Sequence, residues 1–356
     1  MGKKVRILSL DGGGIRGIIP ATVLEYLENQ LIKKTNNPNA RLADFFDIIV
    51  GTSTGGILAC FYLTPNPNTD STAPSSKYIA TEALELYSKK GELIFEESRR
   101  KSWFGLRQMF NATRYRANNL EKIFKEEFGE LKFNNLIKPC VVTTYDMEKQ
   151  SSFFFNSREE LDKKRSFYLK DVARSTSAAP TYFEPAKIKN LITGDEMTNL
   201  DGGVFANNPS MCGYAECRTT EFKQVKCPNA SDMLFLSIGT GGGQLHFPKL
   251  NKVGVWNVIK WAKSAPDIMM DGSIDTVHYQ MKQLFETVKS SDSNSNYKRI
   301  DVPLEKRRYD SDMSNASENN IQALKKAGGE ALKEALKQKE NEMTLDTFID
   351  KLIENQ

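Results

Sequence analysis

Cysteine and histidine are both scarce in this sequence. Its 356 residues include five cysteines, an odd number at scattered positions, and no two of them are spaced as Cys-x-x-Cys. This usage indicates reduced thiols in a reducing compartment and argues against a zinc site. We therefore expect no metal and no other cofactor. Only two histidines are present, which limits the choice of a catalytic base.

Long apolar runs are missing as well. No stretch approaches the roughly 18 apolar residues that a membrane-spanning helix needs. The N-terminus begins like a signal peptide, but its apolar run from Ile7 to Leu10 is too short, and Asp11 ends it. Arg6 occupies the position where a myristoylation signal requires serine or threonine. We therefore expect a cytoplasmic protein.

A strong charge of either sign is also absent. The net charge is +4, with 39% hydrophobic and 26% charged residues, which is ordinary for a globular protein with a full core. This charge alone indicates no nucleic-acid partner. Because the chain shows neither an internal repeat nor a clear linker, we expect one compact domain followed by a C-terminal helical extension.

The stretch from Asp47 to Gly56 is the most informative part of the chain. A buried apolar strand leads into Gly51-Thr-Ser53-Thr-Gly55, and an apolar helix starts near Thr54. This context is typical of a nucleophile elbow, in which Gly51 and Gly55 allow a sharp turn. The serine would stand at the positive end of the helix, which favours a developing negative charge. An isolated match would indicate only a glycine-rich turn with a serine N-cap.

A second glycine-rich segment, Asp11 to Gly17, directly follows a short apolar strand at Val5 to Leu10. A helix from about Pro20 to Lys34 comes next, with its apolar residues on one face. The order of strand, glycine loop, helix, strand, elbow and helix is typical of an α/β fold with a parallel sheet.

The glycine loop has two interpretations. Gly12, Gly14 and Gly17 match the dinucleotide-binding pattern in form, but no acidic residue follows the second strand at the expected distance. Alternatively, Gly12, Gly13 and Gly14 form an oxyanion hole, because three successive glycines leave backbone N–H groups unobstructed beside the elbow. Arg16 adds a positive charge nearby. The elbow favours the oxyanion hole; a nucleotide-binding dehydrogenase or regulator is the alternative.

A serine nucleophile needs a base, which is usually a histidine oriented by a carboxylate. His246 follows a further glycine loop at Gly239 to Gly243, and His278 lies in a predicted helix, so neither stands in a glycine turn at a strand end. Asp201 does so within Asn199 to Val204, although Asp-Gly is also a common plain turn. A carboxylate acting directly on the serine is therefore favoured, and partial burial would raise its pKa into the working range of a base.

Four further segments bear on the surroundings of the site. Thr64 to Ser76 predicts a polar surface loop, and the small residues of Ala173 to Pro180 predict close packing beneath the site. Ser98 to Arg116 mixes basic and aromatic residues, which indicates either a solvated helix with one packed face or a surface for lipid headgroups or nucleotides. A basic amphipathic helix from Asn320 to Lys337 is expected to dock on the domain rather than on a membrane.

Together these motifs resemble the patatin-like phospholipase family. The resemblance covers roughly residues 5 to 245 and lies in Asp11–Gly17, Gly51–Gly55, Tyr115-Arg116, Ser177–Pro180, Asp201–Gly203 and Gly239–Gly241. It implies a patatin-like three-layer α/β/α fold with a mostly parallel central sheet. The implied catalytic domain is 5–245, continuing to about 310, and the C-terminal helical extension is 311–356.

The resemblance also implies a reaction, the hydrolysis of acyl esters of membrane phospholipids by a Ser–Asp dyad without histidine. Such a phospholipase A would act at the inner face of the membrane. The residues carried over by motif are the nucleophile Ser53, the base Asp201, the oxyanion hole of Gly12, Gly13 and Gly14 with Arg16 in support, and the elbow glycines Gly51 and Gly55. None of these positions departs from the family pattern.

Within the family, a compact chain without a lipid anchor or ankyrin repeats resembles the bacterial phospholipase effectors of cyclic-oligonucleotide antiphage defence. This implies a resting enzyme that a cyclic dinucleotide activates, with a homo-oligomer as a further expectation. The alternatives are a constitutive, non-specific lipid acyl hydrolase without a defence role and a catalytically idle lipid-binding or storage protein. Labelling of Ser53 by a fluorophosphonate would separate the hydrolases from the idle and nucleotide-binding alternatives.

Overall fold

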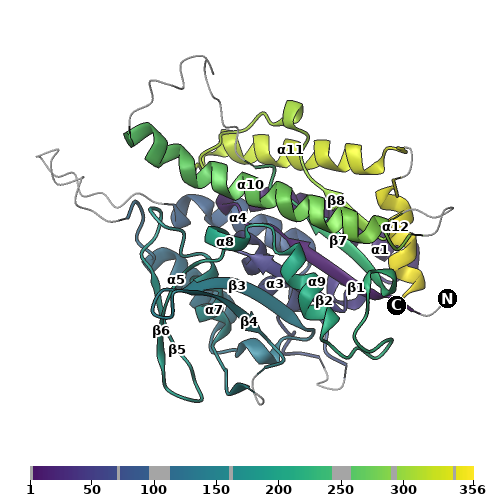
Figure 1. Ribbon diagram of the computed structural model, residues 1–356, viewed down its shortest axis with the longest axis horizontal. Coiled ribbons are helices and arrows are strands. Elements are labelled where there is room, and N and C mark those ends of the chain that lie inside the picture. Colours follow the sequence, from purple (N-terminus) through teal and green to yellow (C-terminus); the bar gives the residue numbers. More distant parts are fainter. Residues whose placement is uncertain are drawn as a thin grey trace, which may run out of the picture.

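The structure, a computed structural model, describes residues 3–69, 73–95, 113–159, 163–242, 258–289, 295–339 and 342–356. An eight-stranded sheet forms its centre, with strand order β5-β6-β3-β2-β1-β7-β8 and β4 paired to β3 (Figure 1). The strands are β1 (Val5–Leu10), β2 (Ile48–Thr52), β3 (Cys140–Asp146), β4 (Ser151–Asn156), β5 (Ala186–Lys189), β6 (Glu196–Asp201), β7 (Met233–Ile238) and β8 (Tyr297–Ile300).

The sheet is mostly parallel, as predicted. Strands β1, β2, β3, β7 and β8 all run in one direction. Strands β4 and β6 pair antiparallel with β3, and β5 pairs antiparallel with β6. Parallel strands that are covered on both faces need nearly continuous apolar sequences, and β1 is buried at all of its positions.

Helices cover both faces of this sheet and complete the predicted α/β/α layers (Figure 1). Successive side chains of a strand point to opposite faces. Leu8 and Leu10 therefore pack with α1 and α3, whereas Val5 and Ile7 pack with α9 and α10. The helices are α1 (Ile18–Thr35), α2 (Leu42–Phe45), α3 (Thr54–Leu63), α4 (Ala80–Ile94), α5 (Asn118–Phe128), α7 (Leu169–Thr176), α8 (Gly203–Ala206), α9 (Ser210–Arg218), α10 (Val258–Glu286), α11 (Glu318–Leu336) and α12 (Leu345–Glu354), with 3-10 turns η1 (Gly14–Gly17), η3 (Phe133–Asn135), η4 (Ala230–Asp232) and η6 (Leu304–Lys306).

The C-terminal helices α11 and α12 pack on the same face of the sheet as α1. Ile321 and Leu324 of α11 and Phe348 of α12 are buried in the apolar cluster that contains α1. This confirms that the predicted amphipathic helix docks on the domain, although Leu336 in its last turn is 37% exposed. The division of the chain into segments 5–245 and 311–356 stays a prediction.

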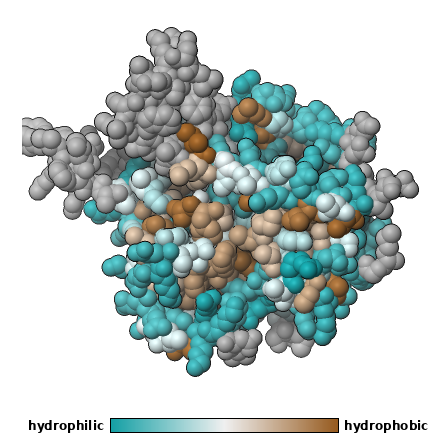
Figure 2. All heavy atoms as spheres, in the orientation of Figure 1, coloured by the Kyte–Doolittle hydropathy of each residue, from teal (hydrophilic) through white to brown (hydrophobic). Residues whose placement is uncertain are grey.

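The surface combines polar and apolar side chains. Figure 2 shows apolar residues gathered near the middle of one face, with hydrophilic residues around them. Within the described ranges, no helix has both the length and the apolar character that crossing a bilayer requires.

Candidate active site

The turn between β2 and α3 places Ser53 at the C-terminal end of a central parallel strand. Ser53 is the N-cap of α3 and has φ 53° and ψ −123°, a conformation that residues other than glycine rarely adopt. Its glycine neighbours are required by close approach. A Cβ on Gly51 would lie 2.4 Å from the Gly55 carbonyl oxygen, and a Cβ on Gly55 would lie 2.2 Å from the Leu10 carbonyl oxygen. The predicted strand, sharp turn and helix are therefore present.

Ser53 and Asp201 meet although they are 148 residues apart in the sequence. The Ser53 hydroxyl donates a hydrogen bond of 2.6 Å to Oδ2 of Asp201. Strand β3 brings them together, because its Thr143 pairs with Thr52 of β2 and its Thr144 pairs with Asp201 of β6. The serine after β2 and the aspartate at the end of β6 thus reach the same point above the sheet.

The Asp201 carboxylate is buried, and within the described ranges no cation pairs with it. Its Oδ1 accepts the Gly203 N–H at 2.7 Å, while its Oδ2 accepts the Ser53 hydroxyl. Burial raises the pKa of Asp201 to about 7, although both hydrogen bonds act in the opposite direction. A carboxylate with a pKa near neutrality is suited to take up and release a proton during catalysis.

The end of α7 and the residues that follow it contact both Ser53 and Asp201 from below. The Thr176 hydroxyl accepts the Ser53 backbone N–H at 2.8 Å and donates to the Thr143 carbonyl oxygen at 2.8 Å. The Asp201 N–H donates to the Ala178 carbonyl oxygen at 2.9 Å. The segment from Ala173 to Pro180 therefore packs beneath the site as predicted. The contribution of the Thr176 hydroxyl was missed, because one threonine in a run of small residues gives no distinguishing signal.

The first glycine loop lies directly beside the serine. A Cβ on Gly12 would be 3.2 Å from the Cβ of Ser53 and 2.2 Å from Oδ1 of Asn207. The Gly12 N–H donates to the Asn207 carbonyl oxygen at 2.9 Å, so it offers no hydrogen to a bound anion. Gly13 and Gly14 are left as the donors of the predicted oxyanion hole. Asn207 was missed in the sequence, because its position beside Gly12 depends on how α8 folds over the loop.

The N–H groups of Gly13 and Gly14 donate to no other group in the part of the chain that the structure describes. The carbonyl oxygens of the same two peptide groups, those of Gly12 and Gly13, accept hydrogen bonds. Thr240 donates its hydroxyl to the Gly12 oxygen at 2.6 Å, and Arg16 donates its backbone N–H to the Gly13 oxygen at 3.1 Å. Because C=O and N–H point in opposite directions in a planar trans peptide, both N–H groups are directed away from these partners. Two such donors suit a developing oxyanion.

Arg16 lies within the same loop. Its side chain is buried, and Nε donates to the Gly13 carbonyl oxygen at 3.4 Å. Its Nη1 is buried without a hydrogen-bond partner among the residues that the structure describes. The guanidinium group therefore places positive charge next to the glycine peptides, in the position that the sequence indicated.

The two histidines do not contribute to this arrangement as far as the structure describes them. His278 lies on α10, where its Nδ1 is 3.1 Å from the Tyr297 hydroxyl, and burial lowers its pKa to about 4. His246 lies outside the described residues. In the described ranges, no three His, Cys, Asp or Glu side chains are grouped so that they could hold a metal ion.

Two surface segments from the sequence analysis are described only in part. Residues 70–72 of the Thr64–Ser76 loop and residues 98–112 of the Ser98–Arg116 segment lie outside the described ranges. At the end of the second segment, Arg114 pairs with Asp312 at 2.7 Å, and the Tyr115 hydroxyl donates to Ser314 at 2.8 Å. This end is therefore anchored to the chain that precedes α11.

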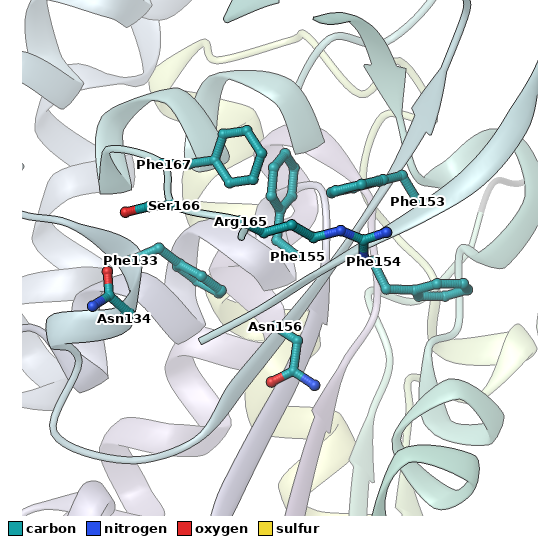
Figure 3. Close-up of a pocket in the computed structure, with 9 residues that line it drawn as sticks. All are labelled: Phe133, Asn134, Phe153, Phe154, Phe155, Asn156, Arg165, Ser166 and Phe167. Carbon is teal, nitrogen blue, oxygen red and sulfur yellow. The ribbon is translucent and has the colours of Figure 1, made fainter. Parts of the chain in front are cut away.

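An aromatic pocket near β4 is separate from these residues (Figure 3). The rings of Phe153, Phe155 and Phe167 pack edge to face, and the Arg165 guanidinium lies 4.8 Å from the centre of the Phe153 ring. None of the predicted site residues lines this pocket. It is therefore not part of the candidate active site.

Residues 8–211, which contain Ser53, Asp201 and the first glycine loop, match the family model described as patatin-like phospholipase. The chain is 32% identical to Patatin-17 of Solanum cardiophyllum, over 94% of this chain and 85% of that protein. It is 33% identical to the probable inactive patatin-3-Kuras 1 of Solanum tuberosum, over 84% of this chain and 79% of that protein. Among solved structures, VipD from Legionella pneumophila is similar with a TM-score of 0.37 and 11% identity, over 92% of this chain and 67% of that chain. The sequence matches show that the chain belongs to the patatin-like phospholipase family of lipid acyl hydrolases.

Proposed function

We propose that the protein is a phospholipase A that cleaves acyl esters of membrane phospholipids, with Ser53 as the nucleophile and Asp201 as the base. The observation that carries this proposal is the 2.6 Å hydrogen bond between the Ser53 hydroxyl and a buried carboxylate that has no cationic partner in the described part of the chain. Family similarity alone is a weaker support, because one relative at 33% identity bears the name of a probable inactive patatin.

The reaction proceeds through an acyl-enzyme. Asp201 accepts the hydroxyl proton as Oγ of Ser53 attacks the ester carbonyl carbon, and the carbonyl π electrons move to the oxygen. The resulting oxyanion accepts hydrogen bonds from the N–H groups of Gly13 and Gly14. The intermediate then expels the lysolipid alkoxide, which takes the proton from Asp201. In the second half, Asp201 deprotonates a water that attacks the acyl carbon, and Ser53 leaves with that proton while the fatty acid is released.

The surface near Asp201 supports a lipid substrate. Val204, three residues after the carboxylate, is 47% exposed, and Phe154 of β4 is 36% exposed. The rings of Phe154 and Phe205 lie edge to face with centroids 5.8 Å apart, which joins β4 to the end of α8. Apolar side chains exposed together are typical of surfaces that contact lipid or another apolar partner.

A fluorophosphonate probe and phospholipid vesicles test the proposal. The wild-type protein should be labelled at Ser53 and should release fatty acid. Folded Ser53→Ala should do neither, with a loss in kcat on the order of 10⁴ or more, because a covalent route has no substitute nucleophile. Circular dichroism checks the fold of the variant. Substantial hydrolysis by folded Ser53→Ala would contradict the proposed chemistry, and an unlabelled wild-type protein would favour an idle lipid-binding protein.

We further propose that the enzyme is a regulated antiphage effector that a cyclic dinucleotide activates at the inner face of the membrane. Support comes from the resemblance stated above and from the damage that an unrestrained phospholipase would do to its own cell. The arginines and aromatic rings of Ser98–Arg116 suit an anionic ligand with stacking bases. Shifting a resting to an active state from 1:99 to 99:1 requires a preference of about 5.5 kcal/mol, part of which a homo-oligomer would supply.

Hydrolysis of vesicles with and without a panel of cyclic dinucleotides tests this regulation. Weak activity alone and strong stimulation by one ligand are expected, with light scattering reporting any change of oligomeric state. Equal and full activity in all samples would reject the regulation and leave the hydrolase chemistry standing.

A further inference from the structure

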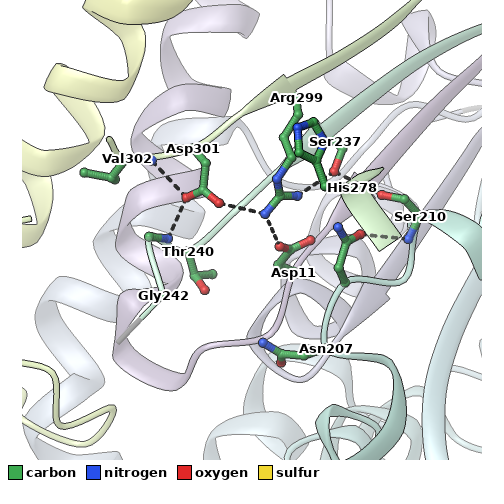
Figure 4. A network of polar contacts seen from close by, with 12 residues as sticks. Asp11, Asn207, Ser210, Ser237, Thr240, Gly242, His278, Arg299, Asp301 and Val302 are labelled. Carbon is green, nitrogen blue, oxygen red and sulfur yellow. Dashed lines mark hydrogen bonds and ion pairs between the residues drawn. The ribbon is translucent and has the colours of Figure 1, made fainter. Parts of the chain in front are cut away.

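A buried ion network lies at the C-terminal ends of β1, β7 and β8 (Figure 4). Nη2 of Arg299 donates to Oδ2 of Asp11 and to Oδ2 of Asp301, both at 2.7 Å, and Nη1 donates to the Ser237 hydroxyl at 2.8 Å. The side chains of Arg299 and Asp11 are 7% and 0% exposed. Arg299 lies far beyond residue 211, where the match to the family model ends. Strand β8, which is distant in the sequence, therefore contacts the start of the first glycine loop.

Asp301 extends this network to the second glycine loop, which follows β7. Its Oδ1 accepts the N–H groups of Gly241 and Val302, each at 2.8 Å. A Cβ on Gly239 would lie 2.0 Å from Oδ2 of Asp301, so the carboxylate and the loop are in direct contact. The position of the second glycine loop is therefore set by the partly buried carboxylate of Asp301, which Arg299 holds in place.

Thr240 connects the second glycine loop to the first. It is 1% exposed, and its hydroxyl donates to the Gly12 carbonyl oxygen at 2.6 Å. A Cβ on Gly13 would lie only 2.4 Å from that hydroxyl oxygen. The Gly12 carbonyl and the Gly13 N–H belong to one planar peptide group. A hydroxyl that fixes the carbonyl therefore also fixes the direction of the N–H.

We propose that Thr240, held by the Arg299–Asp301 pair, is a positioning residue that directs the Gly13 N–H toward the oxyanion. This role rests on the proposed function, because it concerns the oxyanion of that reaction. Donors stabilise the transition state when they are roughly 2.7–3.1 Å from the place where the oxyanion forms, rather than from the ground-state carbonyl. Rotation of the Gly12–Gly13 peptide therefore weakens transition-state binding more than substrate binding, which lowers kcat and leaves KM nearly unchanged.

Two substitutions of Thr240 separate the hydroxyl from the shape of the side chain. Valine keeps the shape but donates no hydrogen bond, whereas serine keeps the hydroxyl. With a short soluble p-nitrophenyl ester, we expect Thr240→Val to lower kcat by roughly 10- to 100-fold, with KM within about twofold of wild type. Thr240→Ser should restore most of the lost kcat. If Thr240→Val does not fold, Thr240→Ala provides the same comparison with serine.

Lys298→Met is the matched control on β8. Lys298 is also a buried cation, but its Nζ donates to the Met343 carbonyl oxygen at 2.6 Å, away from the glycine loops. Its loss should lower Tm and leave kcat unchanged, whereas Arg299→Met should lower both. If the role of the network is merely structural, Arg299→Met and Lys298→Met should have equal kcat.

A folded Thr240→Val or Thr240→Ala enzyme with the kcat of wild type overturns the proposed role. If those variants are slow and Thr240→Ser is equally slow, the role is overturned as well. Labelling of wild-type Ser53 by a fluorophosphonate is measured beside these variants. If wild type is labelled and hydrolyses the ester while Thr240→Val equals it, only the positioning role is rejected. If wild type is not labelled, the proposed function itself fails.

Discussion

Asp201 and Asp11 are both buried at the C-terminal edge of the sheet, but their surroundings differ. Asp201 accepts hydrogen bonds from a hydroxyl and a backbone N–H, whereas Asp11 faces the Arg299 guanidinium at 2.7 Å. Burial raises the pKa of Asp201 to about 7 and that of Asp11 to about 6, where Arg299 offsets part of the effect. Oδ1 of Asp11 is buried without a partner in the described ranges, and the nearby Asp301 charge also raises the pKa of Asp11.

The difference shows how one residue type serves two purposes in one site. A buried carboxylate without a cation gains and loses a proton easily near neutral pH, so it suits a base. A buried carboxylate beside an arginine is tied to a fixed geometry, because separating the two charges leaves one of them unpaired in a poorly solvated place. These surroundings suit Asp201 to the proposed proton exchange and Asp11 to holding the loop.

The strongest test of this contrast replaces the proposed base, Asp201. Asp201→Asn keeps the shape of the side chain and one acceptor for the Gly203 N–H, but it cannot accept the Ser53 proton. We expect kcat on a soluble ester to fall by roughly 10³- to 10⁴-fold, with the fold retained by circular dichroism. His278→Gln serves as the control and should stay within about threefold of wild type, as should His246→Gln. A histidine variant as slow as Asp201→Asn would require a triad instead of a dyad.

The pH dependence of wild-type kcat/KM should report the same carboxylate. Because the base must be ionised, activity should be low in acid, rise with an apparent pKa near 7, and level off above it. Between pH 8 and pH 5 we expect a decrease of about 100-fold, since each pH unit well below the pKa leaves tenfold less of the base ionised. A profile that is flat down to about pH 5 would mean that Asp201 titrates with an ordinary pKa and would contradict this view of its surroundings.

Neutralising Asp11 should have a smaller effect on rate than neutralising Asp201. Asp11→Asn leaves Arg299 buried with Asp301 as its remaining carboxylate partner, and we expect kcat to fall by roughly 10-fold because the first glycine loop loses its ionic contact. Arg299→Met instead leaves two carboxylates without their cation, and we expect the free energy of unfolding in urea at pH 8 to fall by about 3 kcal/mol. Asp11→Asn in that background should recover part of the stability, because it removes a buried carboxylate whose pKa is raised. A wild-type kcat in Asp11→Asn would show that the ion pair does not hold the loop.

The smallest expected effect is a gain in stability when the proposed base, Asp201, is replaced. The pKa of Asp201 is higher in the folded than in the unfolded state, so its contribution to stability is full below about pH 4 and is lost as pH rises through about 7. Asp201→Asn has no such loss. At pH 8 we expect this variant to be more stable than wild type by roughly 1 to 2 kcal/mol, or a few degrees in Tm. The difference should shrink at pH 5, and a lower Tm of the variant at pH 8 would refute the expectation.

Local patterns in the sequence were sufficient to predict the elements that surround Ser53. Strand β2, the glycine turn and α3 follow from a short apolar run, closely spaced glycines and a second apolar run, all within about 20 residues. The end of β6 at Asp201 was predicted in the same way, from one acid followed by two glycines. Such features are encoded by neighbours in the chain, so periodicity and turn residues identify them.

Features that depend on distant pairing were not predictable from the sequence. Strand β8 has only four residues, two of which are Lys298 and Arg299, so it lacks the apolar pattern of a buried strand. Its pairing with β7 brings Arg299 within reach of Asp11, which is 288 residues away. In the same way, the contact between Asn207 and the Gly12 N–H depends on how α8 folds back over the loop. No local pattern near Gly12 indicates that one of the three glycine N–H groups is occupied.

The location of Arg299 on β8 has a consequence for the time at which activity arises during synthesis. Ser53 leaves the ribosome 246 residues before Arg299 (299 − 53), which at roughly 5–20 residues per second corresponds to about 12 to 50 s. If Arg299 and Thr240 position the oxyanion donor, a nascent chain carries its serine throughout that interval without a completed site. Stalled nascent chains that end before β8 should then hydrolyse no ester. A lipid acyl hydrolase of this kind would thus acquire its activity only after β8 has been synthesised.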